Sequence, residues 1–205
     1  MNKTAIVEAQ YFGCVQYIST FATCSSVQIE QLENWQKSSF RNRTVLVGSN
    51  GLISISVPIL HGREQHQPVK EIRIDNDEKW QAHHWKTIFS CYGKAPFFEF
   101  YKDELHDILF KKKCDFLFDL NIEILRWILK KLKLSSSITF TEEYFTQSND
   151  GIDDLRNKWL PKNFQLDSSC EKQYSQVFQE KTGFQKNVSI LDLLFCEGPN
   201  ARTFL

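Results

Sequence analysis

Residues 44–58 read TVLVGSNGLISISVP, and this stretch carries the clearest fold signal of the chain. Two apolar runs flank the Asn-Gly pair at 50–51, residues that tolerate the positive φ angles of a tight hairpin turn. In the second run Ile53, Ile55 and Val57 alternate with serine and therefore share one strand face. The stretch predicts an antiparallel β-hairpin with that apolar face buried.

The segment before the hairpin predicts a strand, a loop, a helix and a second strand. Residues 5–7 form a short apolar run, apolar side chains recur at helical spacing over 15–22, and residues 27–30 alternate like a strand. After the hairpin we expect mostly helices, and Asp119 is the expected N-cap of the third long one. The further expected elements are a surface loop at 61–68, strands at 72–74 and 137–141, long helices at 77–92, 97–110 and 119–132, and short helices at 153–159 and 189–195, the last beginning with a Ser189-to-Asp192 capping box.

These elements predict an α/β protein with an N-terminal mixed sheet that includes the β-hairpin, helices packed around that sheet, and a helix-rich C-terminal half. A length of 205 residues suits one domain, and no linker or repeat interrupts it, so we expect residues 1–205 to form a single domain. The chain is 41% hydrophobic and has 17 phenylalanines, which is ample for a packed core.

Charge and cysteine content narrow the class of protein. Lysine plus arginine equals aspartate plus glutamate at 25 each, so nothing predicts a general attraction to nucleic acid. No apolar stretch reaches 18 residues and no secretory leader is visible, so we expect no membrane span and a cytoplasmic location. The six cysteines show no CxxC or zinc-ligand spacing, and we expect reduced thiols and no metal site.

Residues 33–43 are the strongest functional signal. This polar run sets a carboxylate, amides, serines and three cations around Trp35 and Phe40. The aromatic rings can stack on a base or sugar, and the arginines can bind phosphate through two hydrogen bonds. The alternative is a solvated loop between two strands. We favour a binding site, because a surface loop seldom needs two bulky aromatic side chains.

Three further candidates lie outside this run. Residues 10–12, Gln-Tyr-Phe, follow the first strand, where ligands bind in open α/β sheets, although an aromatic plug over the core is the alternative. His84 lies on an apolar helix stripe and is a candidate general base, or else a structural histidine with satisfied hydrogen bonds. Asp75 ends a short predicted strand and orients a hydroxyl, ligates a metal, or caps the next helix.

Familiar catalytic signatures are absent. The sequence contains no P-loop, GxGxxG, GxSxG, HExxH or EF-hand motif. Several large enzyme classes are therefore excluded in their usual forms, and any chemistry must be assigned from individual side chains.

An ordered set of short segments, together covering nearly the whole chain, resembles the WbqC-like family of bacterial proteins, and most of all its short Bacteroides-type members. Two departures stand out: Gly13 follows the Tyr-Phe pair, where many members have proline, and Phe40 stands where others have tryptophan. The matching segments are residues 10–12, 34–37, 40–43, 56–58, 72–76, 80, 84–85, 92–98, 117–121 and 189–195.

The resemblance implies a role in surface-polysaccharide or O-antigen biosynthesis and supplies no established reaction. We expect a sugar-modifying enzyme, most plausibly one that transfers an acyl or aminoacyl group to an amino sugar or nucleotide-sugar. The alternative is a non-catalytic glycan- or nucleotide-sugar-binding module. A mechanism that depends on Cys14, at the start of the first predicted helix, is a weaker third option.

The expected site combines residues of these segments. His84 would be the general base, and Lys37 with the arginines would bind an anionic group. The ligand is a small molecule or sugar, while the cofactor and the oligomeric state stay undetermined. The catalytic candidates are His84, Lys37 and Asp75, and the substrate-binding candidates are Gln10, Tyr11, Asn34, Trp35, Gln36, Arg41, Asn42, Arg43 and Trp80.

Overall fold

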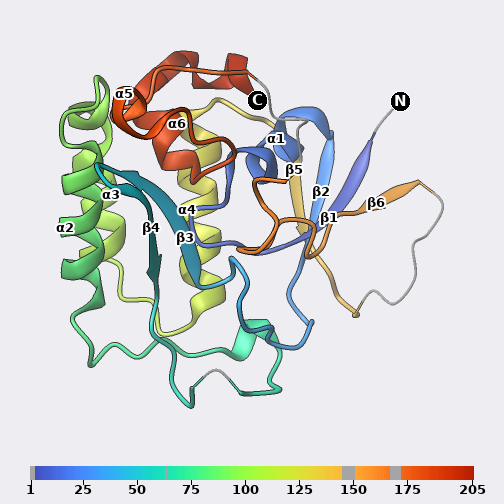
Figure 1. Cartoon of the computed structure of the whole chain (residues 1–205). Helices are drawn as coiled ribbons and strands as arrows, with labels where there is room; N and C mark the ends of the chain where they lie inside the picture. Colours follow the sequence, from blue (N-terminus) through green and yellow to red (C-terminus); the bar gives the residue numbers. More distant parts are fainter. Residues whose placement is uncertain (1–2, 63, 145–150, 167–171) are drawn as a thin grey trace.

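The computed structural model describes residues 3–62, 64–144, 151–166 and 172–205 and contains a parallel β-sheet. The sheet has four strands in the order β5-β2-β1-β6, and all neighbours run parallel (Figure 1). β1 and β2 pair residue for residue, from Thr4 opposite Ser26 to Glu8 opposite Glu30. The strands are β1 (Thr4–Glu8), β2 (Ser26–Glu30), β5 (Ser137–Phe140) and β6 (Ile152–Asp154).

The strand order creates a reversal point beside β1. Helix α1 (Val15–Thr23) carries the chain from β1 to β2, and β5 then adds on the far side of β2. The chain returns to pair β6 with the opposite edge of β1. In open parallel sheets the crevice for a ligand forms at such a reversal, beyond the carboxyl ends of the strands.

The hairpin predicted at 44–58 is confirmed and forms a two-stranded sheet of its own. β3 (Arg43–Gly48) and β4 (Gly51–Ser56) are antiparallel, with the turn where the Asn-Gly pair placed it. Ile55 and Val57 are buried, whereas Ile53 is 38% exposed, so the expected apolar face is buried only in part. The reason is that Ile53 lies in the exposed part of β4, residues 52–54, whereas its partner Leu46 on β3 is fully buried.

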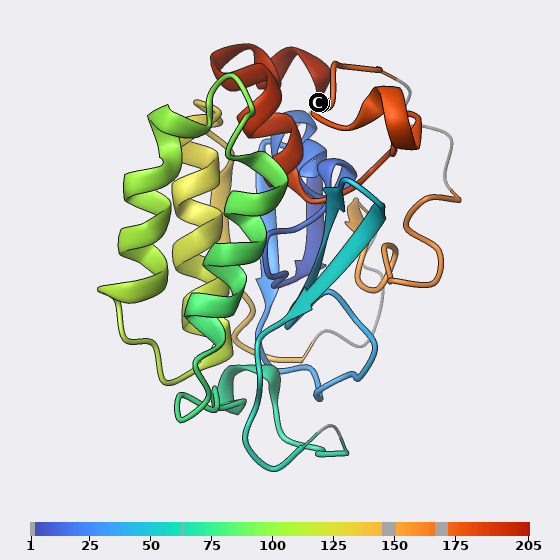
Figure 2. The same cartoon turned by 60° about the vertical axis from the view of Figure 1, so that its left-hand side comes forward.

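Helices cover one side of the molecule. In Figures 1 and 2, α2 (Trp80–Tyr92), α3 (Phe98–Phe110) and α4 (Leu117–Lys131) stand roughly parallel to one another. The expected α4 is confirmed, but its N-cap is Phe116 and Asp119 lies in the first turn, because the helix begins two residues before Asp119. The remaining helices are α5 (Gln179–Thr182), α6 (Ile190–Glu197) and the 3-10 turns η1 (Val69–Glu71) and η2 (Gly198–Phe204).

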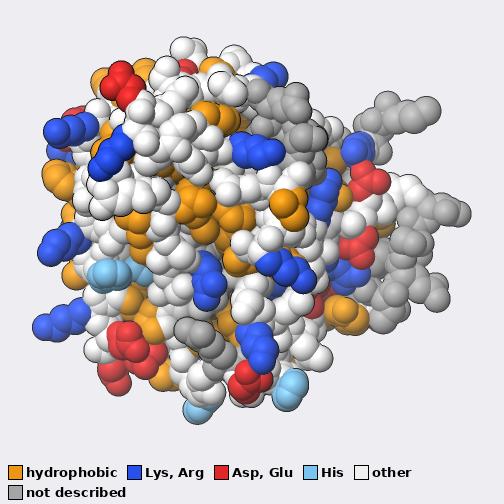
Figure 3. All heavy atoms as spheres, viewed as in Figure 1, with side chains coloured by type: hydrophobic (Ala, Val, Ile, Leu, Met, Phe, Trp, Pro, Cys, Tyr) orange, Lys and Arg blue, Asp and Glu red, His pale blue; other side chains and the backbone are white. Residues whose placement is uncertain are grey.

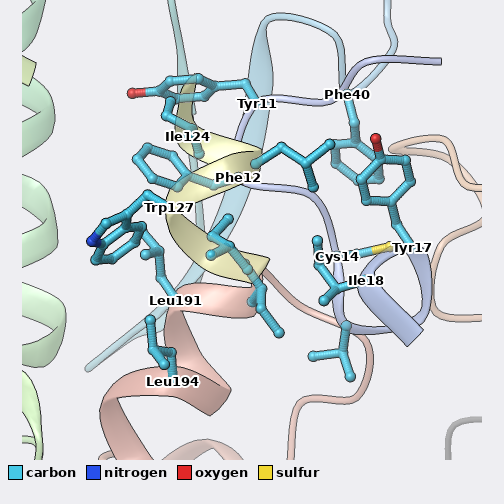
Figure 4. Packing of buried hydrophobic residues seen from close by; sticks show 14 of the residues in the cluster. Tyr11, Phe12, Cys14, Tyr17, Ile18, Phe40, Ile124, Trp127, Leu191 and Leu194 are labelled. Carbon is cyan, nitrogen blue, oxygen red and sulfur yellow. The ribbon is translucent and has the colours of Figure 1, made fainter. Parts of the chain in front are cut away.

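The segment that follows β1 is part of the core. Figure 4 shows the rings of Tyr11 and Phe12 beside Ile124 of α4, with Leu191 of α6 close by. Both rings are fully buried, and Phe12 has a left-handed backbone with φ 44°. The aromatic plug considered for residues 10–12 is therefore present in the fold.

Two expected elements are wrong. Residues 72–74 do not form a strand: Arg73 and Ile74 make only isolated bridges, to Phe116 and Ile59. The helix expected at 153–159 is also wrong, because Ile152–Asp154 is strand β6 and the residues after it form turns. Parallel pairing with β1 overrides the weak helical spacing at this position.

The predicted fold class is confirmed. The chain is a mixed α/β protein with a parallel sheet, an antiparallel hairpin and helices in its C-terminal half. Among the described residues, no helix is both long and apolar enough to cross a membrane. Figure 3 shows lysine and arginine side chains spread over one face with acidic side chains among them, in keeping with the balance of 25 and 25.

Candidate functional site

Two buried carboxylates mark the carboxyl edge of the sheet. Glu8 ends β1 and Glu30 ends β2, the two residues are register partners, and both are fully buried. Strands β1 and β2 point downward in Figure 2, toward the loops at 31–42 and 57–79 that gather below the sheet. Burying a carboxylate costs free energy unless hydrogen bonds or opposite charges compensate, so the surroundings of each glutamate define the site.

Glu8 is held by residues from two segments. Its Oε1 accepts a hydrogen bond from Gln10 Nε2 at 2.8 Å, and its Oε2 accepts one from the backbone N–H of Asn157 at 2.9 Å. Asn157 lies just after β6, so the Glu8 carboxylate joins the two sides of the reversal point.

Glu30 is held in a similar way on the next strand. Its Oε1 accepts hydrogen bonds from the backbone N–H of Leu32 and the hydroxyl of Thr141, each at 2.8 Å. Its Oε2 lies 3.3 Å from Nη1 of Arg156, which also bonds Asp154 through Nη2 at 2.7 Å. Arg156 therefore ties the end of β2 to the end of β6.

Glu33 adds a third carboxylate, paired with a fully buried arginine. Arg41 donates from Nε to Oε1 at 2.8 Å and from Nη2 to Oε2 at 2.5 Å. Burial raises the pKa of Glu33, while Arg41 opposes that rise and the negative charges of Glu8 and Glu30 add to it. The three glutamates therefore share one electrostatic environment.

The buried carboxylates of Glu8, Glu30 and Glu33 are called the carboxylate layer below. A pocket of about 490 Å³ opens beside this layer. We call it the Trp35 pocket, and its lining residues are Leu32, Glu33, Asn34, Trp35, Gln36, Tyr144 and Asn157. Glu33 and Asn157 connect the pocket to the layer behind it, because Glu33 bonds Arg41 and Asn157 bonds Glu8. The pocket therefore lies at the carboxyl edge, beside the reversal of strand order.

Buried polar atoms lack partners at the same place. Gln10 Oε1, Arg41 Nη1 and Asn157 Oδ1 are buried and have no hydrogen-bond partner among the described residues. The other polar atoms of Gln10 and Arg41 bond Glu8 and Glu33, which places both side chains in the carboxylate layer. A buried polar atom without a partner is costly, so such a concentration is typical of a site that takes up water or a ligand.

The structure brings together five of the predicted binding residues. Asn34, Trp35 and Gln36 line the Trp35 pocket, while Gln10 and Arg41 form part of the layer behind it. Arg41 binds Glu33 through two nitrogens. Its predicted contact with a phosphate group stays a prediction.

The other cations and Asn42 lie elsewhere. Lys37 is exposed and forms an ion pair with Glu64 at 2.5 Å. Asn42 Nδ2 bonds the Val57 carbonyl at 2.9 Å, and Arg43 Nε bonds the Ser56 hydroxyl at 3.2 Å, so both brace the base of the hairpin. Their predicted roles toward a ligand stay predictions.

Trp80 and His84 of α2 form a second group with Tyr11, beside the end of β4. The His84 ring lies 2.8 Å from the Tyr11 hydroxyl through Nδ1 and 3.2 Å from the Ser56 carbonyl through Nε2. Its ring centroid is 5.1 Å from that of Trp80. Burial lowers the pKa of His84 to about 4. His84 is therefore a neutral, buried histidine near neutral pH, and its role as a general base stays a prediction.

Asp75 and Cys14 lie apart from the Trp35 pocket. Asp75 Oδ1 accepts a hydrogen bond from the backbone of Asp77 at 3.2 Å, which braces the turn before α2. Cys14 is the N-cap residue of α1 and is 4% exposed. Among the described residues, no group of three His, Cys, Asp or Glu side chains is arranged to hold a metal ion.

Sequence reasoning missed Glu8, Glu30, Arg156 and Asn157, and did not single out Glu33. The signal for the two strand-end glutamates was present, because each closes a short apolar strand at the edge where ligands bind. Arg156 and Asn157 were placed in a helix that does not exist.

The fold and the site define a mixed α/β protein with a pocket at the carboxyl edge of a parallel sheet. Residues 9–159, more than half of the chain, match the model of the WbqC-like protein family, and the chain belongs to this family. The chain is 27% identical over 229 residues to uncharacterized protein Rv1507c of Mycobacterium tuberculosis, and the match covers 100% of this chain and 98% of that protein. No solved structure matches the chain significantly.

Proposed function

We propose that this WbqC-like protein is a sugar-modifying enzyme of surface-polysaccharide or O-antigen biosynthesis. It transfers an acyl or aminoacyl group to an amino sugar or nucleotide-sugar, and the acceptor sugar binds in the Trp35 pocket. The observation that carries the proposal is the pocket itself, with its aromatic, amide and carboxylate lining at the carboxyl edge of the sheet.

The lining suits a sugar in two ways. The indole of Trp35 offers an apolar surface to the C–H face of a pyranose ring. Asn34, Gln36 and Asn157 supply amide donors and acceptors, and Glu33 supplies a carboxylate, for the hydroxyl groups.

Glu33 is the group in the pocket best suited to accept a proton. In acyl transfer the acceptor nitrogen or oxygen attacks the carbonyl carbon of the donor, and the bond to the leaving group of the donor breaks. The proton that the attacking atom loses passes to Glu33, whose pKa burial raises. Arg41 holds that carboxylate in place through its two hydrogen bonds. His84, another candidate base on this chain, does not line the pocket.

The second candidate function is a non-catalytic glycan- or nucleotide-sugar-binding module. One observation favours it: both oxygens of Glu33 already accept hydrogen bonds from Arg41, an arrangement that suits a rigid recognition surface. The same pocket lining serves recognition without chemistry.

Binding and turnover together separate the two functions. Thermal-shift measurements against nucleotide-sugars, amino sugars and acyl or aminoacyl donors are expected to find a ligand that raises the melting temperature. At a ligand concentration of about 100 Kd the stabilisation is about 2.7 kcal/mol, or roughly 5–10 °C. Mass spectrometry of the mixture then reports the modified sugar.

Variants assign the result to the pocket. Glu33→Gln is expected to lose turnover at saturating ligand, and because it leaves Arg41 buried without its counter-charge, its melting temperature without ligand is measured first. Lys158→Ala, outside the pocket, serves as the exposed control. Normal binding with no donor ever consumed supports the binding module. A protein that no sugar or donor stabilises contradicts both functions.

We further propose that residues 1–205 act as one domain in the cytoplasm. The hydrophobic core supports the domain assignment, because it runs from Ala5 to Ala201 in a single cluster. No disulfide joins the five cysteines that the structure describes, which is in keeping with a reducing compartment.

A further inference from the structure

Asn157 occupies an unusual position in the Trp35 pocket. Its backbone is left-handed, with φ 58°, a conformation that asparagine tolerates better than most residues. The backbone N–H donates to Glu8 Oε2 at 2.9 Å, so the buried carboxylate fixes Asn157 at the reversal point. Arg156, one residue earlier, is fixed by Glu30 and Asp154. The side chain of Asn157 is therefore presented to the pocket from a backbone that is held on both sides.

The carbonyl oxygen of that side chain is a ready acceptor. Asn157 Oδ1 is buried and has no hydrogen-bond partner among the described residues, although Asn157 lines the pocket. Gln10, which is 2% exposed and bonds Glu8, also presents an Oε1 without a partner in the described part of the chain. Because Gln10 does not line the pocket, it is the acceptor of Asn157 that favours a ligand that donates hydrogen bonds.

The charges of the same layer favour a cation. Glu8, Glu30 and Glu33 carry three negative charges when ionised, against the two positive charges of Arg41 and Arg156. Arg156 is shared with a further carboxylate, Asp154, at 2.7 Å. The excess of negative charge lies in a region that solvent screens weakly, where its attraction for a cation is strongest.

We propose that the Trp35 pocket binds a sugar that carries a protonated amino group, and that Asn157 is its specificity-determining residue. Oδ1 of Asn157 accepts a hydrogen bond from the ammonium group, and the carboxylate of Glu33 lines the same pocket. The inference rests on the proposed function, because it assumes that the pocket binds a sugar, and it narrows the ligand to an amino sugar. Before acyl transfer, the ammonium group loses one proton to water and attacks as the neutral amine, so that Glu33 is free to accept the second proton, which the nitrogen loses during the attack.

The test compares matched pairs of sugars on matched variants. D-glucosamine and D-glucose, each as the free sugar and as the UDP-sugar, are titrated by calorimetry into the wild-type protein and into Asn157→Gly. Glycine accepts the positive φ and keeps the N–H that bonds Glu8, so the fold is retained while the side-chain acceptor is removed. Lys158→Ala, an exposed neighbour outside the pocket, is the control.

The wild type and Lys158→Ala are expected to prefer the amino sugar by roughly tenfold or more, the range of a hydrogen bond to a charged group. Asn157→Gly is expected to lose most of that preference and to keep its affinity for D-glucose. Asn157→Asp, which keeps an acceptor oxygen and adds a negative charge, is expected to retain the preference for the amino sugar.

Two results overturn the inference and leave the proposed function standing: equal affinity of the wild type for both sugars, or an unchanged preference in Asn157→Gly. Failure of the wild type to bind any of the four sugars overturns the proposed function, and this inference with it.

Discussion

Arg41 and Glu33 face each other through two parallel hydrogen bonds, Nε to Oε1 at 2.8 Å and Nη2 to Oε2 at 2.5 Å. The arginine is fully buried and the glutamate is 6% exposed. Asn121 of α4 also donates to the Arg41 backbone carbonyl at 2.7 Å. The loop at 31–42 is therefore anchored to the helical layer through Arg41, and the pocket carboxylate takes its orientation from that anchor.

Removal of one partner of the Arg41–Glu33 pair is expected to lower the free energy of unfolding far more than removal of both. Arg41→Met leaves Glu33 buried without its counter-charge and is expected to lower the free energy of unfolding by about 3–5 kcal/mol. The double variant Arg41→Met/Glu33→Leu is expected to recover most of that loss. Urea unfolding measures both, and Lys37→Met, at an exposed ion pair, is expected to change little. A double variant no more stable than Arg41→Met contradicts the prediction.

The tautomer of His84 follows from its partners. The Ser56 carbonyl can only accept, so Nε2 carries the proton and Nδ1 accepts from the Tyr11 hydroxyl. Tyr11→Phe leaves Nδ1 buried without a donor and is expected to cost about 1–3 kcal/mol of stability. Nitrogen chemical shifts of His84 check the tautomer, and a proton on Nδ1 in the wild type contradicts this assignment.

Two buried groups, His84 and Asp192, are expected to change the free energy of unfolding in opposite directions as pH changes. Burial lowers the pKa of His84 to about 4 and raises the pKa of Asp192 to about 6. The His84 contribution to stability is present above pH ~6.5 and is lost as pH falls toward 4. The Asp192 contribution is present below pH ~3.8 and is lost as pH rises through 6.

Each effect is about 3 kcal/mol, so the two nearly cancel between pH 4 and 6 in the wild type. Asp192→Asn is expected to leave the His84 effect, with stability that falls on acidification. His84→Gln is expected to show the reverse slope. Denaturant unfolding at several pH values between 4 and 7 measures both slopes, and parallel slopes in the two variants contradict the assignment.

A glycine at the end of α6 is expected to be irreplaceable. Gly198 has φ 55°, and a Cβ there would lie 2.4 Å from ring carbons of Phe97. Gly198→Ala therefore adds overpacking, typically about 1–3 kcal/mol, to backbone strain of about 1–2 kcal/mol. Gly183 also has a positive φ, 69°, but a Cβ there meets nothing within 4 Å, so Gly183→Ala is the matched control for strain alone. Equal melting temperatures for the two variants contradict the packing argument.

Local patterns predicted the local elements well. The hairpin at 44–58 and the three long helices were expected from turn residues and periodicity, and both signals act over a few neighbouring residues. Strand β6 was missed because its three residues owe their conformation to pairing with β1, almost 150 residues earlier.

The site was predicted only in part for the same reason. Asn34, Trp35 and Gln36 were expected because they are contiguous and include an aromatic side chain. Glu8, Glu30 and Asn157 were missed, because each is an ordinary polar residue until the sheet brings their segments together. Asp192 was expected in a capping box, yet its carboxylate accepts buried hydrogen bonds from Tyr174 and Gln176, each at 2.7 Å.

The sequence by itself determined the hairpin, the first two strands and the long helices, because hydrophobic periodicity and turn chemistry are properties of near neighbours. The strand order β5-β2-β1-β6, and the pocket at the reversal beside β1, were decided only by the tertiary structure. Parallel pairing joins residues that are far apart in the chain, and no local signal encodes that register. The tertiary structure also decided the charge states of Glu33, His84 and Asp192, because burial shifts the pKa of each of these side chains.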